Sequence, residues 1–314
     1  MLYVNQIGDA QFPPPYTCRN VEILSFRLPA SLDALTQLCD ERLNIGDLDD
    51  RGFLFRPVFP FVDLEILHYP EMEYGFLPQF GVISQRECYV RLFVMKYILI
   101  GGWLVPDGEV AMYCPFLVVD HPWSAFSGRD VLGFPKLLGT FAPYSTASPY
   151  PTVSTMAFTS GSLQPSVLPV IELAQAAAGS PPPPLLQWPW GHIDLDLLHP
   201  LQRPLGGSLR FDPALFASVQ MKQFRDAENP FGACYQAILQ SGVFLAESTD
   251  PQPLPPVEVT IRDRPGLIPQ YRGIDLAASL GMPSDTPITP MSQYHITCTF
   301  TFTGGLTIFE NSDF

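Results

Sequence analysis

Apolar residues along this chain follow mainly the two-residue period of β-strands. Val, Ile, Phe, Tyr and Thr gather in segments of about six to ten residues, and Pro or Gly bounds most of them. The pattern predicts strands at Val21–Leu28, Phe53–Ile66, Val82–Tyr97, Ala111–Val119, Val153–Thr159, Val167–Leu173, Val257–Ile261 and His295–Phe309.

Helical patterns are fewer. Ser31 is a suitable N-cap for a helix whose leucines recur at every third position. Asp212 and Pro213 are typical of a cap and first turn, which predicts a second helix running toward Phe224, and a weaker pattern predicts a third at Phe231–Leu239. Strands outnumber helices and do not alternate with them, so we expect a mostly β, α+β fold with an antiparallel, barrel-like sheet.

The 314 residues suffice to bury a full core, and we expect one domain over residues 1–314. Thirty-five prolines are about twice the ordinary share, and they punctuate strand ends. The run around 174–190, which contains four consecutive prolines, predicts an inserted extended loop.

Charge and targeting signals narrow the class of protein. The chain has 17 basic and 31 acidic residues, and a basic surface is what phosphate backbones require, so we expect no nucleic-acid partner. The N-terminus lacks the pattern of a signal peptide, and the longest apolar stretch, Leu92–Val105, is too short and too interrupted to span a membrane. Six scattered cysteines without a CxxC pair favour a reduced, cytoplasmic protein.

Cofactor signatures are missing from the sequence. The five histidines never fall at HxH or HxxxH spacing, which argues against a metal site. The sequence also has no P-loop, no GxGxxG and no GxSxG motif, and its glycine pairs fit turns better. We therefore expect no cofactor and no metal.

Lysine is rare: only Lys96, Lys136 and Lys222 occur. Lys96 fits a strand edge and Lys222 a solvated helix face, whereas every neighbour of Lys136 from Val131 to Leu138 is apolar or glycine. Two interpretations of Lys136 remain open. It extends from an apolar turn to water, or it lies buried, where loss of hydration favours the free amine.

A free lysine amine attacks ketones to form a Schiff base. The resulting iminium withdraws electrons from the adjacent carbon, which is the physical basis of decarboxylation and aldol chemistry. The composition around Lys136 thus makes it a candidate nucleophile.

The residues around this lysine resemble the acetoacetate decarboxylase family. The chain reads Gly-Arg-Asp at 128–130 and Phe-Pro-Lys at 134–136, with Asp-His-Pro at 120–122 before them, as in the family's signature. The resemblance covers most of the chain and is weakest between residues 142 and 256. It implies the barrel-like fold of that family, a small keto-acid substrate and a homo-oligomer.

The resemblance also implies roles for particular residues. Lys136 would form the imine, and Glu87, on a strand similar to the family's glutamate-bearing strand, would orient the substrate and move protons. Arg19, eight residues before Arg27, matches the family's active-site arginine and would hold the substrate carboxylate. Gln85 lies on the same strand face as Glu87 and would contact the substrate.

Arg129 would contact the substrate or, paired with Asp130, fix the loop that presents Lys136. One departure from the family pattern bears on the substrate. Acetoacetate decarboxylases have two adjacent lysines, whereas residue 137 here is leucine.

Three hypotheses follow. The first is a lyase that decarboxylates a β-keto acid through an iminium on Lys136. The second is an aldolase and dehydratase that acts on pyruvate-type α-keto acids through the same lysine, with Glu87 or Gln85 handling protons. The third is a non-catalytic ligand-binding relative. Release of CO2 from acetoacetate distinguishes the first from the second, and a covalent adduct on Lys136 excludes the third.

Overall fold

The computed structural model describes residues 11–76, 78–142, 150–158, 165–177, 215–226, 233–268 and 271–311, and strands dominate them. The strands are β1 (Tyr16–Pro29), β2 (Phe53–Pro57), β3 (Phe61–Tyr74), β4 (Val82–Ile100), β5 (Trp103–Val119), β6 (Lys136–Phe141), β7 (Val153–Phe158), β8 (Pro165–Gln175), β9 (Leu215–Arg225), β10 (Ala233–Ser248), β11 (Gln252–Pro253), β12 (Val257–Ile261), β13 (Arg264–Ile268), β14 (Tyr271–Ile274), β15 (Pro287–Ile288) and β16 (Ser292–Asn311). The helices are α1 (Leu32–Arg42), α2 (Leu48–Arg51), α3 (Pro122–Asp130), α5 (Leu276–Leu280) and the short 3₁₀ helix η1 (Pro78–Phe80).

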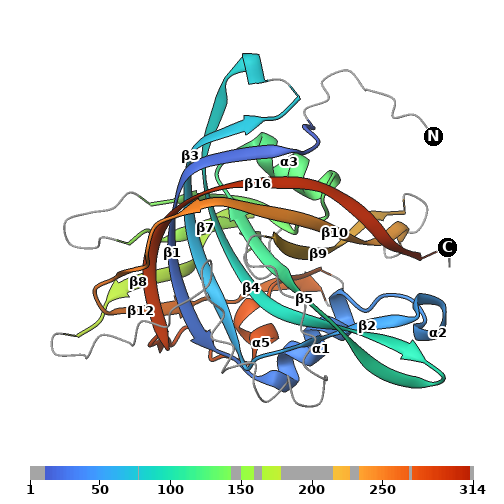
Figure 1. Ribbon diagram of the computed structural model, residues 1–314. Helices are drawn as coiled ribbons and strands as arrows, with labels where there is room; N and C mark the ends of the chain where they lie inside the picture. The colour runs from blue at the N-terminus through green and yellow to red at the C-terminus, as the bar shows by residue number, and fades with distance from the viewer. Residues whose placement is uncertain are drawn as a thin grey trace.

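The long strands close into a ring. Hydrogen bonds connect β4, β5, β9, β10, β16, β1 and β3 in that order, and β3 pairs with β4 again (Figure 1). At β5 the sheet branches, because β6 pairs with residues 117–119 of β5 whereas β9 pairs with residues 111–113. The branch continues through β7, β8, β12 and β15. The mostly β fold class is confirmed, although β5 pairs in parallel with both β6 and β9, so the sheet is mixed.

Most of the predicted strands are confirmed, with one division. The predicted strand Phe53–Ile66 is two strands, β2 and β3, because the chain bends at residues 58–60. Pro57 and Pro60 flank this bend, and proline cannot donate the hydrogen bond that a continuing central strand needs.

Only the first predicted helix is confirmed. Ser31 caps α1, and its side chain accepts a hydrogen bond from the backbone N–H of Ala34. The predicted helices toward Phe224 and at Phe231–Leu239 are wrong for the residues that the structure describes, because 215–224 and 233–239 form parts of β9 and β10, which pair with each other. Pairing with ring neighbours on both sides overrides a weak local helical signal.

One prediction lies partly outside the described residues. The proline-rich insertion around 174–190 lies outside the described residues from position 178 onward, and β8 ends at Gln175. Among the helices of the described residues, none is long and apolar enough to cross a membrane.

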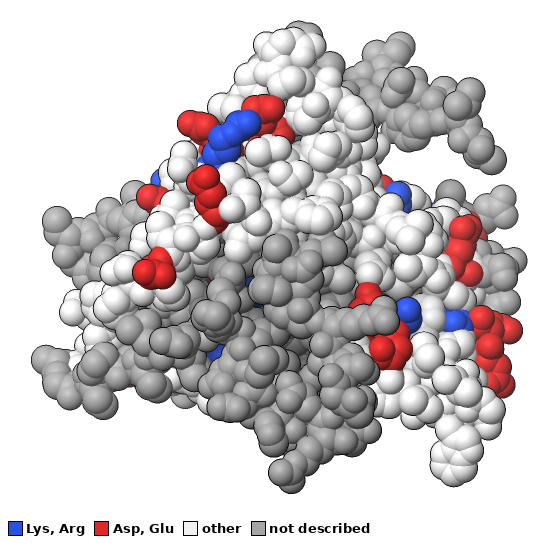
Figure 2. All heavy atoms as spheres, viewed as in Figure 1, with Lys and Arg blue, Asp and Glu red and all other residues white. Residues whose placement is uncertain are grey.

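The visible surface carries few charges. In Figure 2, most described side chains on this face are uncharged, and acidic groups outnumber basic ones. This fits a chain with 31 acidic and 17 basic residues.

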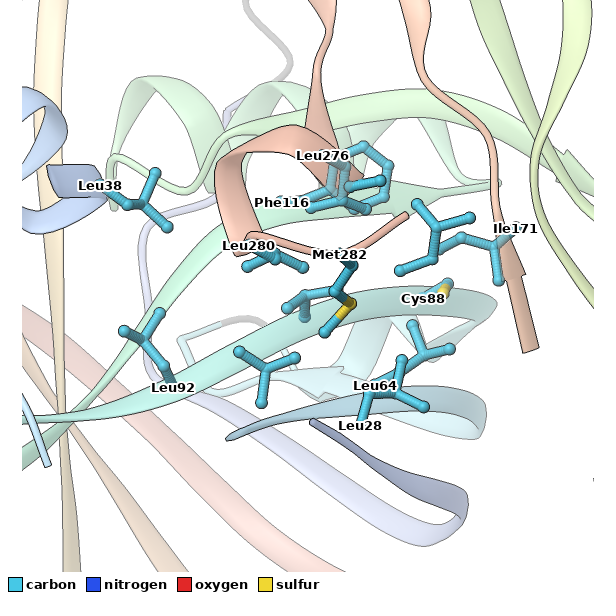
Figure 3. Close-up of a cluster of buried hydrophobic side chains, with 14 of the residues drawn as sticks. Leu28, Leu38, Leu64, Cys88, Leu92, Phe116, Ile171, Leu276, Leu280 and Met282 are labelled. Atoms are coloured by element: carbon cyan, nitrogen blue, oxygen red, sulfur yellow. The ribbon is translucent and has the colours of Figure 1, made fainter. Parts of the chain in front are cut away.

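The main apolar core lies between the sheet and the helices α1 and α5. Because side chains alternate along a strand, Cys88, Val90 and Leu92 of β4 face this core, where they are fully or almost fully buried. Leu276 and Leu280 of α5 face the same cluster (Figure 3). The residues that alternate with them, Gln85, Glu87, Tyr89 and Arg91, point into the ring and line its cavity.

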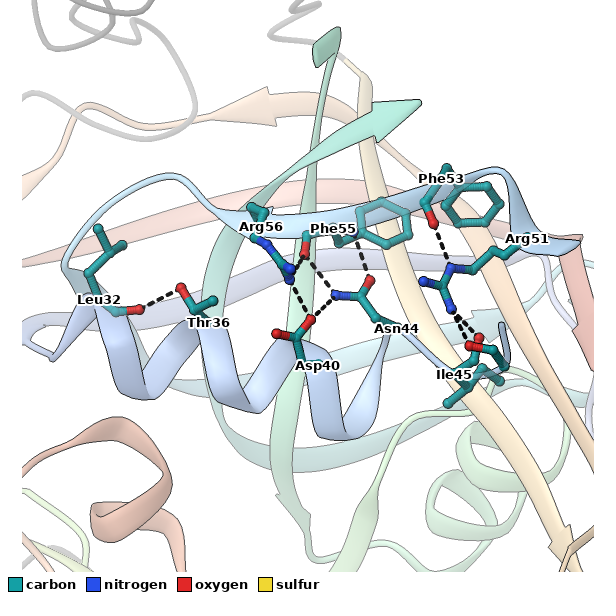
Figure 4. A network of polar contacts seen from close by, with 10 residues as sticks. Leu32, Thr36, Asp40, Asn44, Ile45, Arg51, Phe53, Phe55 and Arg56 are labelled. Carbon is teal, nitrogen blue, oxygen red and sulfur yellow. Dashed lines mark hydrogen bonds and ion pairs between the residues drawn. The ribbon is translucent and has the colours of Figure 1, made fainter. Parts of the chain in front are cut away.

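A polar network fastens the end of α1 to β2. The side chain of Asn44 accepts a hydrogen bond of 2.8 Å from the backbone N–H of Phe55 and donates one of 3.0 Å to its carbonyl, as the backbone of a neighbouring strand would (Figure 4). Arg51 donates to the carbonyl of Phe53 at 2.5 Å, and burial lowers the pKa of its guanidinium. The network thereby fixes the position of the C-terminal end of α1 against β2.

Buried charges fill one part of the ring's interior. Arg27 binds Asp63 through two hydrogen bonds of 2.8 and 3.1 Å, and Arg91 contacts Glu65 at 2.6 Å and Asp63 at 3.5 Å. All four side chains are nearly inaccessible, so each charge depends on its partner. Burial raises the pKa of Glu65 despite the opposing effect of Arg91.

Replacing Arg91 with methionine tests this cluster. The change leaves two buried carboxylates without one of their cations, and we expect a loss of about 3–5 kcal/mol in the free energy of unfolding. The exposed pair of Arg56 and Asp40 gives the control, because Arg56→Met should cost at most about 1 kcal/mol.

The loss of stability caused by Arg91→Met should depend on pH. Because the pKa of Glu65 is raised in the folded state, the native protein binds a proton there more readily than the unfolded chain does. The free-energy cost of burying ionised Glu65 is therefore present in full when the pH is above the pKa of Glu65 in the folded state. This cost decreases as the pH falls below that pKa. Urea titrations should show a smaller deficit of Arg91→Met at pH 5 than at pH 8, and an equal deficit would contradict the assignment.

Candidate functional site

Lys136 is the first residue of β6, directly after the turn that follows α3. That turn depends on Gly133, whose φ of +76° suits glycine and whose missing side chain makes room for the backbone of Lys222. Register with β5 then places Lys136 opposite Leu117. Only 9% of Lys136 is exposed, so its side chain lies inside the protein and does not extend to water.

The ammonium of Lys136 has two partners. Its Nζ lies 2.5 Å from Oε1 of Glu87 on β4 and 2.9 Å from Oγ of Ser124 on α3. A charge-assisted bond of this kind is shorter and stronger than a neutral one. It compensates for taking both charges out of water.

Further donors surround the Glu87 carboxylate. Gln85 donates from Nε2 to Oε1 at 2.9 Å, and Tyr69 donates its hydroxyl to Oε2 at 3.1 Å. Burial and the neighbouring Glu87 raise the pKa of Tyr69 well above its usual value, so this phenol keeps its proton. The carboxylate is thus held from β3, β4, β6 and α3 together.

A glycine on α3 makes room for the lysine. A Cβ on Gly128 would lie 2.4 Å from Cε and 2.5 Å from Cδ of Lys136. The helix therefore passes so close to the lysine that any other residue at position 128 would displace it.

These groups face a cavity of about 620 Å³ inside the ring. Polar lining groups include Gln85, Glu87, Ser124 and Lys136, whereas aromatic and aliphatic side chains make up most of the remaining wall. Described residues that line the cavity include no cluster of three or more His, Cys, Asp or Glu suited to a metal ion.

Two cysteines in the cavity wall are unsuited to nucleophilic chemistry. Burial and the charge of Glu87 raise the thiol pKa of Cys18 and of Cys114. The thiolate is the nucleophilic form, so both thiols stay protonated and inert. The lysine is the better candidate for covalent chemistry.

Three of the five predicted site residues come together. Lys136, Glu87 and Gln85 all line the cavity and are connected by hydrogen bonds.

The other two lie elsewhere. Arg19 is the strand neighbour of the cavity-lining Cys18, and because strand side chains alternate it points to the opposite face. There it pairs with Glu73 at 2.8 Å, and its side chain is 41% exposed. Arg129 is exposed near the end of α3. Neither arginine reaches the cavity.

The structure adds Ser124 and Tyr69, which the sequence analysis missed. Ser124 could have been found through the Asp-His-Pro turn at 120–122, because Pro122 opens α3 as its first residue. Tyr69 carried no local signal, since its role depends on the register of β3 against β4.

Leu137 takes the place of a second lysine, and it lies on the other side of the strand. Lys136 faces the cavity, whereas Leu137 packs against the main core. A strand places successive residues on opposite faces, so residue 137 does not share the cavity.

A sequence model described as acetoacetate decarboxylase matches residues 2–156 of the chain. That range includes Gln85, Glu87, Ser124 and Lys136. This N-terminal part of the chain matches the acetoacetate decarboxylase family. No curated protein matches the sequence.

Solved structures of this family share the fold at low sequence identity. Acetoacetate decarboxylase from Legionella pneumophila is 12% identical, with a TM-score of 0.54 over 96% of this chain and 90% of that chain. A second acetoacetate decarboxylase structure is 12% identical, with a TM-score of 0.51 over 98% and 94% of the two chains. The enduracididine biosynthesis enzyme MppR, complexed with pyruvate, is 14% identical, with a TM-score of 0.51 over 95% and 91%.

Substitution of Gly128 tests the geometry of the lysine. Gly128→Ala should push Lys136 away from Glu87, and a displacement of about 1 Å can lower a reaction rate by about a hundredfold. We expect that loss in the rate at which Lys136 reacts with a ketone, measured by borohydride reduction and mass spectrometry. Phe126→Ala, on the exposed side of the same helix, is the control and should keep the rate. An unchanged rate in a folded Gly128→Ala variant would contradict the close contact.

Proposed function

We propose that this protein is a Schiff-base-forming lyase that decarboxylates a β-keto acid through an iminium on Lys136. The observation that carries the proposal is the contact of 2.5 Å between Lys136 Nζ and Glu87 Oε1 inside a largely apolar cavity. A nucleophile within hydrogen-bond reach of a base is the arrangement that covalent catalysis requires.

Glu87 activates the lysine. Its carboxylate takes a proton from the Lys136 ammonium, and the neutral amine attacks the ketone carbon of the substrate. A proton passes from the nitrogen to the oxygen of this adduct and gives the carbinolamine. Glu87 then returns its proton to the carbinolamine hydroxyl, which leaves as water, and the iminium forms. Ser124, which also contacts Nζ at 2.9 Å, keeps the amine oriented throughout.

The iminium then draws electrons from the bond to the carboxylate. CO2 departs, the bonding pair moves into an enamine, protonation of the adjacent carbon restores the iminium, and water releases a ketone and the free lysine. Since the iminium itself is the electron sink, the sequence of steps needs no cofactor.

Gln85 supplies a position for the substrate's oxygen atoms. Its Oε1 is buried, lines the cavity and has no hydrogen-bond partner in the described part of the chain. A buried acceptor without a hydrogen-bond partner lowers the stability of the fold, so we propose that Gln85 Oε1 accepts a hydrogen bond from the hydroxyl group of the carbinolamine. Arg19 and Arg129 lie outside the cavity, so we assign carboxylate binding to neutral donors near Lys136.

A second candidate function keeps the imine and changes the bond that reacts. Leu137 replaces the second lysine of acetoacetate decarboxylases, and a structural relative, MppR, was solved with pyruvate. An enamine formed from a pyruvate-type acid on Lys136 would add to an aldehyde and lose water, with Glu87 carrying the protons. Assembly as a homo-oligomer and a cytoplasmic location remain predictions.

Trapping with borohydride tests the proposal. With acetoacetate, reduction should leave one adduct per chain, on the peptide that contains Lys136, together with CO2 release in the unreduced reaction. The three lysines of the chain make the mapping unambiguous. Lys136→Ala should give no adduct, whereas Lys222→Ala, the matched control, should give the normal amount. An adduct with pyruvate alone would favour the second candidate, and an adduct on Lys96 or Lys222 would refute both.

Glu87→Gln separates proton transfer from binding. The amide keeps the size of the side chain but accepts no proton, so we expect the rate of imine formation to fall by about 10²–10⁴. The lost rate should return partly at high pH, where solvent deprotonates the amine. A variant with the wild-type rate and pH profile would show that Glu87 only positions the lysine.

A further inference from the structure

The cavity is much larger than acetoacetate. A water-sized group takes up about 30 Å³, so a volume near 620 Å³ has room for roughly 20 such groups. Acetoacetate or pyruvate would fill about a third of this space or less. A small keto acid would leave most of the cavity wall without contact, whereas well-matched sites bury most of a ligand's surface.

The excess space is apolar. Apolar side chains from β1, β3, β5, β10 and β16 make up much of the cavity wall, among them Ile23, Leu67, Met72, Met112, Val243 and Phe300. None of these side chains offers a charge or a strong hydrogen bond. Water molecules next to these side chains would lack hydrogen-bond partners, so this part of the cavity favours a hydrocarbon group of a ligand.

The polar groups are concentrated where the reaction would occur. Glu87, Gln85, Ser124 and Lys136 contact one another within a single cluster. Arg91, which also lines the cavity, is already engaged by Glu65 and Asp63. The cavity therefore has one reactive polar region and one extended apolar region.

Three aromatic side chains of the cavity wall pack together. The ring of Phe12 lies 5.4 Å from that of Trp123 and 5.4 Å from that of Tyr74, and Trp123 is 47% exposed. The backbone of Phe12 donates to Ser127 Oγ at 2.8 Å, which holds this segment against α3. These aromatic faces offer further apolar contact area to a ligand in the cavity.

We infer that the substrate is a keto acid with a long apolar chain, in which roughly six to ten carbons extend beyond the keto-acid head. This inference rests on the proposed function for its head group and on the cavity for its tail. The ketone lies at Lys136, and the alkyl chain lies along the wall that Val243 and Phe300 help to form.

A homologous series of acids tests the tail. Burial of one methylene is worth about 0.8 kcal/mol, which corresponds to about fourfold in affinity. Calorimetry with butyrate, hexanoate, octanoate and decanoate, which carry no ketone and cannot form an imine, should show affinity rising by about two- to fourfold for each methylene. Borohydride trapping with acetoacetate, β-ketooctanoate and β-ketodecanoate should show half-saturation at least about sixtyfold lower for the longest acid, which has six more methylenes than acetoacetate.

Val243 offers a matched pair of variants. It lies in the cavity wall on β10, which contributes no group to the Lys136 cluster. Val243→Phe should fill the apolar region and weaken decanoate binding at least tenfold, with the trapping of acetoacetate unchanged. Val243→Ala, which enlarges the region, should retain decanoate binding. If Val243→Phe does not fold, Met72→Phe on β3 narrows the same cavity and should give the same result.

The outcomes distinguish this inference from the function on which it rests. If acetoacetate is trapped as readily as the long acids, the inference is overturned and the proposed function stands. If saturated acids bind with affinity that rises with length but no keto acid is trapped, the proposed function fails and the apolar ligand class stands. Affinity independent of chain length overturns the inference whatever the trapping result.

Discussion

The contact between Lys136 and Glu87 is the interaction on which the rest of the site depends. Two opposite charges this deep in a protein are stable only together, because each alone would bear the cost of leaving water. Tyr69, Gln85 and Ser124 satisfy the remaining atoms of the pair. The pair is also chemically asymmetric, since a proton shift from the ammonium to the carboxylate creates a nucleophilic amine and a carboxylic acid in contact with each other.

The ring of strands explains how such a pair can be built. Its interior holds two separate polar regions, and they behave differently. In one, Arg27, Asp63, Glu65 and Arg91 neutralise one another and fill the space. In the other, the charges face a largely apolar cavity, so a ligand can approach them in an environment where electrostatic effects are strong. The branch of the sheet at β5 makes this possible, because it places β6, and with it Lys136, at the wall of the ring.

The sequence was sufficient where local signals and packing agree. Strand periodicity and the Ser31 cap predicted most of the strands and α1. The apolar surroundings of Lys136 left open whether it is buried, and the family resemblance pointed to Glu87 and Gln85, which lie beside Lys136 in the cavity. The sequence was insufficient where the pairing register of the strands decides which elements form and which side chains face the cavity. Predicted helices at β9 and β10 carried weak amphipathic patterns that sheet pairing overrides. Arg19 matched a family position, but the bulge between Cys18 and Val21 and the alternation of the strand leave it outside the cavity.

The most direct test of the central claim is a crystal structure of the protein after borohydride reduction in the presence of a β-keto acid. The account predicts continuous electron density from Lys136 Nζ into the ligand, with Glu87 within hydrogen-bond distance of the new secondary amine and the ligand's chain lying along the apolar wall. Density attached to Lys96 or Lys222, or an unmodified Lys136 in a crystal whose cavity holds the intact acid, would contradict it.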